Sequence, residues 1–175
     1  VELEDIDSFW FKRFQWCVGG SHNLRTNENW LPQGKLPAVA LRGGWNRRAA
    51  SEVVESNPLR GWNSRVGVSL APKYEHGKTR AIYACDSLSY FAFTWLLRPV
   101  EKAWQGRRVI LDPGRDGTLG MHNRISGLYS TKRLHTFAML DYSDFNSQHS
   151  LESQKTVISV LLAKCTGADS KLARC

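Results

Sequence analysis

The chain has 175 residues, 42% hydrophobic and 23% charged, with a net charge of +8 and a pI near 9.6. This composition is typical of a globular protein that buries a core, and the absence of any uncharged apolar run of about 18 residues argues against a transmembrane helix. Four cysteines are scattered without a C-x-x-C pair: Cys17, Cys85, Cys165 and Cys175. This pattern argues against a zinc site and favours reduced thiols in an intracellular setting.

The positive charge is concentrated in two regions. Residues 41–80 carry eight Lys or Arg against three acids, and residues 98–133 repeat that ratio. Together with seven Trp, five Tyr and seven Phe, this surplus fits a polyanion partner, with an ordinary solvated basic surface as the equal alternative. The chain begins at Val1, followed by acids, which fits neither a signal peptide nor an initiator Met and suggests a processed or excerpted chain.

The first half of the chain alternates helical and extended patterns. The predicted elements are an amphipathic helix over 3–17, a packed irregular segment over 20–46, a short helix over 47–55, and strands over 66–70 and 81–84. The first helix is predicted from apolar residues at helical spacing: Leu3, Ile6, Trp10, Phe14 and Cys17. Asn57-Pro58 is expected to close the short helix.

The second half begins with the clearest helical pattern. A helix over 87–105 is predicted to bury Trp95 and Trp104, with Pro99 kinking it or starting a second segment. Short strands are predicted over 109–111 and 136–142, and a helix from Ser150 as N-cap to about Lys164. These elements together predict a mixed α/β (α+β) fold.

The stretch KYEHGKTRAIYACD, residues 73–86, gathers cations. Lys73, Lys78 and Arg80 lie within eight residues, and in an extended chain Lys78 and Arg80 point the same way. Gly77 permits a tight bend, and Glu75 is placed to orient one of the basic residues. Such fixed cations are suited to binding a triphosphate.

A P-loop NTPase and an ordinary basic hairpin are two other interpretations of this stretch. Gly77-Lys78-Thr79 resembles a P-loop superficially, but Pro72 stands where that motif requires its first glycine, so a P-loop NTPase is rejected. An ordinary basic hairpin stays open as the alternative to phosphate binding.

The stretch LDYSDFNSQHS, residues 140–150, ends an apolar run in acids. Asp141 follows four apolar residues and Asp144 comes three positions later, a pattern suited to holding Mg²⁺ for phosphoryl transfer. Asn146 is close enough in sequence to approach the same nucleotide. The alternative is that Asp144, Asn146 and Ser150 form turns and cap the next helix.

These stretches in this order resemble the RNA-dependent RNA polymerases of totiviruses and related double-stranded RNA viruses. The resemblance rests on RFQWCVGGSHN near the start, then KYEHGKTRAIYACD, then RVILDPG, then LDYSDFNSQHS, and it spans roughly residues 10–163. It implies a right-hand polymerase fragment. Residues 1–135 would form the fingers and the fingers–palm connection, with basic motif F at 73–86, and residues 136–175 the start of the palm.

The resemblance also implies roles for individual residues. Lys73, Lys78 and Arg80 would bind the incoming nucleotide's phosphates and the template. Asp141 would be the first metal-binding aspartate of motif A, holding Mg²⁺ or Mn²⁺, with Asp144 as a weaker metal candidate. Two further roles concern RNA: Asn146 would sense the ribose 2′-hydroxyl, and Arg115 could approach RNA, with a plain surface turn as the alternative.

The chain also departs from the family pattern. It has no Gly-Asp-Asp turn (motif C), for which Gly167-Ala168-Asp169 is no substitute, and no motif B. Because two-metal catalysis needs the remaining carboxylates, the chain alone is not expected to polymerise RNA. The implied partners are therefore the remainder of the palm and thumb, RNA template and product, NTPs and a viral capsid protein, in the virion interior or host cytoplasm, without a membrane.

Two alternatives to a polymerase part remain. The first is a truncated, polymerase-derived protein that binds RNA without catalysis, through Lys78 and Arg80. The second is an unrelated Mg²⁺-dependent phosphoryl-transfer enzyme or nuclease, which would need further carboxylates from Asp86, Asp112 or Asp116.

Overall fold

The computed structural model describes residues 1–20, 46–104, 117–129, 141, 148–167, 169–171 and 173. The chain divides into two compact units, one of Val1–Pro99 with Cys165–Cys175 and the other of Val100–Lys164. Helices and a two-stranded sheet are both present, which confirms the mixed α+β class. Among the described residues no helix is long and apolar enough to cross a membrane.

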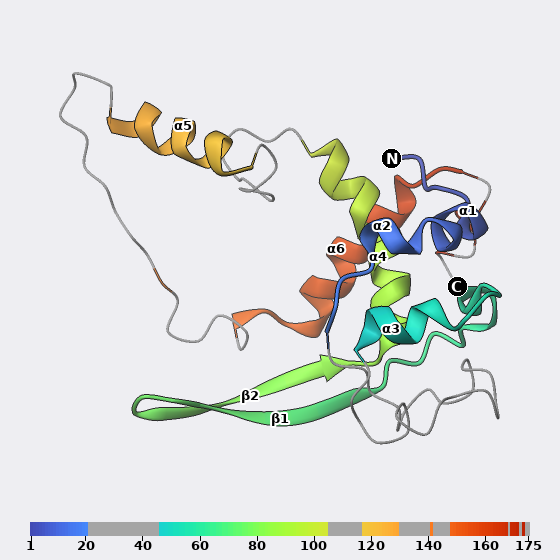
Figure 1. The fold of residues 1–175 in the computed structure, drawn as a ribbon, viewed down its shortest axis with the longest axis horizontal. Helices are drawn as coiled ribbons and strands as arrows, with labels where there is room; N and C mark the ends of the chain where they lie inside the picture. The colour runs from blue at the N-terminus through green and yellow to red at the C-terminus, as the bar shows by residue number, and fades with distance from the viewer. Residues whose placement is uncertain are drawn as a thin grey trace. The chain divides into compact units, whose positions relative to one another are not determined.

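The first unit contains most of the described elements (Figure 1). In chain order these are α1 (Ile6–Phe11), α2 (Arg13–Trp16), α3 (Arg47–Glu52), the 3₁₀ helix η3 (Pro58–Gly61), β1 (Val68–Glu75), β2 (Lys78–Cys85) and α4 (Ser87–Ala103), which runs on into the second unit. The second unit contains α5 (Gly117–Tyr129) and α6 (Leu151–Ala163). The predicted strands over 109–111 and 136–142 lie outside the described residues, apart from Asp141.

The predicted single helix over 3–17 is wrong, because the chain forms two short helices with Lys12 between them. Asp5 caps α1 by accepting a hydrogen bond from the Ser8 amide at 2.8 Å. Phe14 of α2 is 45% exposed, although the sequence predicts it in the buried stripe. Arg13 is buried in its place, and its guanidinium lies 4.5 Å from the centre of the Phe14 ring.

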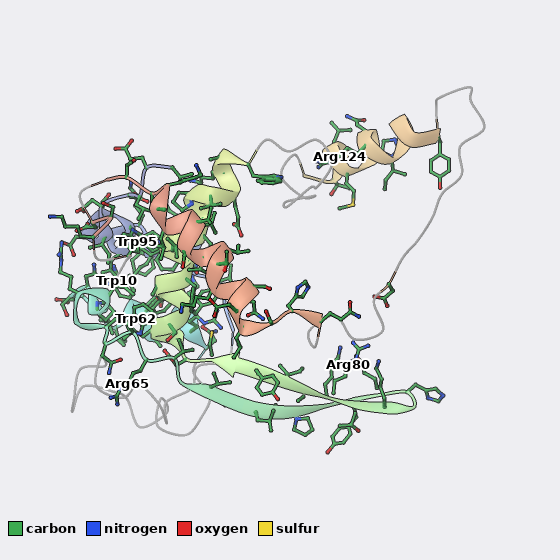
Figure 2. The ribbon with its side chains drawn as sticks, turned by 180° about the vertical axis from the view of Figure 1, so that it is seen from behind. Trp10, Trp62, Arg65, Arg80, Trp95 and Arg124 are labelled. Atoms are coloured by element: carbon green, nitrogen blue, oxygen red, sulfur yellow. The ribbon has the colours of Figure 1, made fainter. Side chains whose placement is uncertain are left out.

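An aromatic cluster forms the core of the first unit. Phe9 stacks on Trp16 with ring centroids 4.1 Å apart, and Phe91 of α4 makes T-shaped contacts with Trp10 and Trp16. Trp95 is buried, as predicted, and its indole N–H donates to the Glu4 carbonyl at 2.8 Å. Figure 2 shows Trp10, Trp62 and Trp95 among the packed helices, whereas Arg80 stands apart on the hairpin.

A buried aspartate joins the hairpin to α4. Asp86 caps α4 by accepting from the Ser89 amide and hydroxyl, each at 2.8 Å. The same carboxylate accepts from the Gly67 amide at 2.6 Å, and the Asp86 amide donates back to the Gly67 carbonyl. Because β1 begins at Val68 and α4 at Ser87, these bonds fix the base of the hairpin to the start of the helix.

Thr166 and Asp169 contact the N-terminal segment. Thr166 forms a parallel bridge with Glu2, and its carbonyl accepts from the Leu3 amide at 2.7 Å. The Asp169 carboxylate accepts from the Ile6 amide at 2.8 Å and so caps α1. Asp169 therefore acts as a cap of α1.

The remaining elements agree with the sequence in part. The short helix, the long helix through Pro99 and the helix capped by Ser150 are confirmed as α3, α4 and α6. Asn57 caps η3 and does not close the preceding helix, which ends earlier. The prediction that Trp104 is buried is wrong: α4 ends one residue before it, and its side chain is 43% exposed. The pattern over 117–129 predicted no element, yet α5 forms there.

Candidate functional site

The sequence predicts two groups of site residues, and the structure describes one of them fully. Lys73, Lys78 and Arg80 all lie on the hairpin of β1 and β2. Of the other group, Asp141 is described and is exposed in the second unit. The remaining predicted residues, Asp144, Asn146 and Arg115, lie outside the described residues, so their roles stay predictions.

The hairpin is longer than the two predicted strands and regular throughout. Its strands are antiparallel in continuous register from Val68 opposite Cys85 to Glu75 opposite Lys78, with His76-Gly77 as the turn. Gly77 has φ +80°, a conformation that glycine adopts without steric cost. The tight bend predicted at this glycine is therefore confirmed. Figure 1 shows the turn end of the hairpin projecting away from α3 and the start of α4.

The register places the three predicted cations on one face of the hairpin. Lys73 is directly opposite Arg80, and Glu75 is directly opposite Lys78. Side chains two residues apart in a strand point the same way, so all four side chains share a face near the turn. These four residues are called the basic face below. One carboxylate against three cations leaves this face with a net charge of +2.

Glu75 lies at the centre of the basic face and joins two of its cations. Its carboxylate oxygens lie 2.7 Å from the Lys73 Nζ and 3.0 Å from the Arg80 Nε. The hydrogen bond from Lys73 lowers the pKa of Glu75 below its usual value, and the charges of Arg80, Lys73 and Lys78 act in the same direction. Glu75 therefore stays ionised at neutral pH and holds a cation from each strand.

Lys78 differs from the other two cations. It lies opposite Glu75 in register, but within the part of the chain that the structure describes it forms no salt bridge. Its ammonium is exposed beside two cations whose positions Glu75 fixes. The basic face thus has two oriented cations and one available cation, an arrangement suited to several oxygens of one phosphate group.

The sequence indicated part of this geometry. The common direction of Lys78 and Arg80 was expected from their spacing and is confirmed by the register. Glu75 was expected to orient one basic residue, whereas it pairs with two, because only the cross-strand register brings Arg80 opposite Lys73. The sequence pattern that could have indicated this pairing is K-x-E (Lys73 and Glu75) and K-x-R (Lys78 and Arg80) on either side of a two-residue turn.

A magnesium site is not assembled by the described residues alone. Among them no three His, Cys, Asp or Glu side chains lie close enough to hold a metal ion. Asp141 offers the oxygen donors that Mg²⁺ prefers, but a single carboxylate does not make a site. Asp86, an alternative donor, is buried and occupied by its contacts with Gly67 and Ser89, and the other two alternatives, Asp112 and Asp116, lie outside the described residues.

The described cysteines are not arranged as a metal site either. Cys17, Cys85 and Cys165 are free thiols, and Cys17 and Cys165 are buried. Burial raises the pKa of the Cys17 thiol, although Ser51 and nearby arginines act against that rise. A protonated, buried thiol is a packing residue and not a reactive one.

Comparison with known proteins gives matches along the whole chain. The family model of viral RNA-directed RNA polymerases matches residues 1–175. A probable RNA-directed RNA polymerase of Helminthosporium victoriae virus-190S is 43% identical over 164 residues, 94% of this chain and 19% of that protein. The corresponding protein of Leishmania RNA virus 1 - 1 (isolate Leishmania guyanensis) is also 43% identical, over 89% of this chain and 17% of its own length.

A more distant relative is the probable RNA-directed RNA polymerase of Saccharomyces cerevisiae virus L-A, 26% identical over 87% of this chain and 10% of its own length. The chain therefore spans about a fifth or less of the relatives that it matches. No solved structure matches it.

Proposed function

Because the chain belongs to the family of viral RNA-directed RNA polymerases, we propose that it forms part of an enzyme that transfers nucleotides from NTPs to an RNA 3′ end. In this proposal residues 1–135 are the fingers and the fingers–palm connection of a right-hand polymerase, and residues 136–175 begin the palm. The boundary between them lies outside the described residues.

The observation that carries the proposal is the basic face of the hairpin. Triphosphates and RNA backbones present clustered anionic oxygens, which bind best to cations already held in position. Glu75 fixes Lys73 and Arg80 at 2.7 and 3.0 Å, which reduces the side-chain entropy that binding would otherwise cost. Lys78 then supplies a further charge to the incoming nucleotide or to the template.

The second part of the proposal concerns Asp141. We assign it as a metal-binding aspartate, with Asp144 as a weaker candidate ligand and Asn146 as the residue that senses the ribose 2′-hydroxyl. Mg²⁺ or Mn²⁺, when bound, would neutralise phosphate charge and activate the attacking hydroxyl. The described residues do not complete a metal site, so the remaining ligands must come from other carboxylates, and the assignment rests on the resemblance.

The proposed partners follow from the same assignment. The enzyme would bind an RNA template and product, NTPs and the remainder of its own palm and thumb. Arg115 would approach the RNA. Contact with a viral capsid protein, in the virion interior or the host cytoplasm, is proposed from the resemblance alone.

Primer extension on an RNA template, by the whole polypeptide that carries this chain, tests the catalytic assignment. Asp141→Asn is expected to lower extension roughly 100-fold or more, because it removes a carboxylate ligand of the metal ion that would neutralise the reacting phosphate, while RNA affinity changes less than about 2-fold. Asp7→Asn is the matched control, since Asp7 is an exposed aspartate paired with Arg60 and not part of the site. Full extension by Asp141→Asn would overturn the assignment.

The same measurements separate the non-catalytic alternative. RNA binding that weakens in Lys78→Ala and Arg80→Ala, without any extension that depends on Asp141, would favour a protein that only binds RNA. If neither Lys78→Ala nor Arg80→Ala changes the RNA affinity, the basic face does not bind RNA, whether the protein is a polymerase or only an RNA binder.

A further inference from the structure

The face of the hairpin opposite the basic face carries two exposed tyrosines. The register places Tyr74 opposite Thr79 and Tyr83 opposite Leu70 on this side of the sheet. Tyr74 is 80% exposed and Tyr83 is 72% exposed. Neither ring contacts another aromatic ring in the described parts of the first unit. This side of the hairpin is called the tyrosine face below.

The two rings have a spacing that suits a nucleic-acid strand. Tyr74 and Tyr83 belong to rows of the sheet four residues apart, about 13 Å along the strands, with Pro72 opposite Ala81 in the row between them. A stacked strand advances about 3.4 Å per nucleotide, so this separation corresponds to about four nucleotides. The small residues between the rings leave the face open.

Cations lie within reach of this face. The hairpin is only two strands wide, about 4.8 Å between backbones, and Lys73 precedes Tyr74 directly. The long side chain of Lys78, which Glu75 does not hold, can therefore extend past the edge of the ribbon to a backbone whose bases lie on the other side. Aromatic rings beside a groove of positive charge are the usual means of binding single-stranded nucleic acid without sequence preference.

We propose that the tyrosine face stacks bases of single-stranded RNA, while the basic face holds phosphates. This inference rests on the proposed function and extends it, because it assigns base contacts to residues outside the predicted phosphate site. Leu70 and Val68 are also exposed on this face, at 65% and 50%. The net charge of +2 across the ribbon favours RNA over an apolar protein surface as the occupant.

Fluorescence anisotropy with a labelled, unstructured 12-nucleotide RNA tests the proposal on the whole polypeptide that carries this chain. Tyr74→Ala and Tyr83→Ala are each expected to weaken binding about 5- to 150-fold, the range expected for one stacked base. Tyr74→Phe and Tyr83→Phe should stay within about 2-fold, because the ring does the stacking. Tyr129→Ala is the matched control, since Tyr129 of α5 is 73% exposed and lies outside the hairpin.

The salt dependence of binding separates stacking from charge. Alanine variants of Tyr74 and Tyr83 should leave the slope of log K against log salt unchanged, whereas Arg80→Ala should reduce it by about 1. If the Tyr74→Ala/Tyr83→Ala double variant binds RNA with wild-type affinity while Arg80→Ala binds it more weakly, the stacking proposal is overturned. The proposed function then remains intact.

Two further results would also count against the proposal. If Leu70→Ala weakens RNA binding as much as Tyr83→Ala, the face is an apolar docking surface and not a stacking platform. If neither Arg80→Ala nor the tyrosine variants change RNA binding, the phosphate-binding role fails together with the stacking role.

Discussion

Glu75 is the residue on which the geometry of the basic face depends most directly. It accepts from Lys73 and lies 3.0 Å from Arg80, so one carboxylate links the two strands near the turn. Because its pKa is lowered in the folded chain, these pairs contribute to stability above the pKa of an unfolded glutamate, about 4.3. That contribution is lost as the pH falls through the lowered pKa. Neutral conditions thus keep the pairs intact.

Glu75→Gln is expected to separate RNA affinity from nucleotide incorporation. Removing the negative charge should strengthen general RNA binding and steepen its salt dependence, because the face gains one net positive charge. The rate of incorporation should nevertheless fall several-fold, because Lys73 and Arg80 lose their fixed orientation. Single-turnover incorporation and anisotropy, measured on the same preparation, check the two effects.

Glu52→Gln provides the control for that prediction. Glu52 is also an exposed glutamate in an ion pair, with Arg48 at 3.7 Å, but it lies on α3 and not on the hairpin. The Glu52→Gln substitution removes the same charge as Glu75→Gln, and it should leave the rate of nucleotide incorporation unchanged. Equal losses of incorporation in both variants would contradict a positioning role for Glu75.

At the scale of elements, local signals predicted some structures well and others poorly. The hairpin turn at Gly77, the cap at Ser150 and the buried stripe of α4 were all indicated by residue type and spacing. The break at Lys12 was not, because the apolar residues over 3–17 also fit one continuous helix. α5 was missed because its three glycines (Gly117, Gly120 and Gly127) weaken the helical pattern.

Asp86→Ala is expected to destabilise the first unit by about 2–4 kcal/mol. The change removes the cap of α4 and leaves the amides of Gly67 and Ser89 without their acceptor in a buried site. Thermal unfolding followed by circular dichroism measures the effect. Ser150→Ala, which removes the exposed cap of α6, is the control and should lower the stability by about 1 kcal/mol. If Asp86→Ala and Ser150→Ala lower the stability equally, Asp86 has no structural role beyond ordinary capping.

Gly167→Ala is expected to weaken the junction between the two ends of the first unit. Gly167 has φ +117°, and an added Cβ would lie 2.7 Å from the Leu3 carbonyl oxygen. Both the backbone conformation and the close contact oppose any larger side chain, so a loss of about 2 kcal/mol or more is expected. The midpoint of chemical denaturation gives the measurement.

Gly127→Ala is the control for the junction. Nothing lies within 4 Å of a Cβ placed at Gly127, which is inside α5, so alanine there should be neutral or stabilising by up to about 1 kcal/mol. A Gly167→Ala protein as stable as the wild type would contradict the account of the junction.

At the scale of the whole molecule, the sequence identified the family more securely than it identified the site. The family is shown by matches along the full chain, whereas a binding site depends on which residues meet in space. The cations of the hairpin could be placed on one face from strand alternation, because register is a local property. The metal site could not be tested in this way, since Asp144 and Asn146 lie outside the described residues.

The central claim is that the basic face binds the phosphates of the incoming nucleotide, and the KM for NTP of Lys78→Ala tests it most directly. In primer extension by the whole polypeptide, the loss of one charge-assisted contact should raise KM about 10-fold or more. Lys12→Ala removes the same charge from a lysine that pairs with Glu4 and should leave KM unchanged. An unchanged KM in Lys78→Ala would contradict the account.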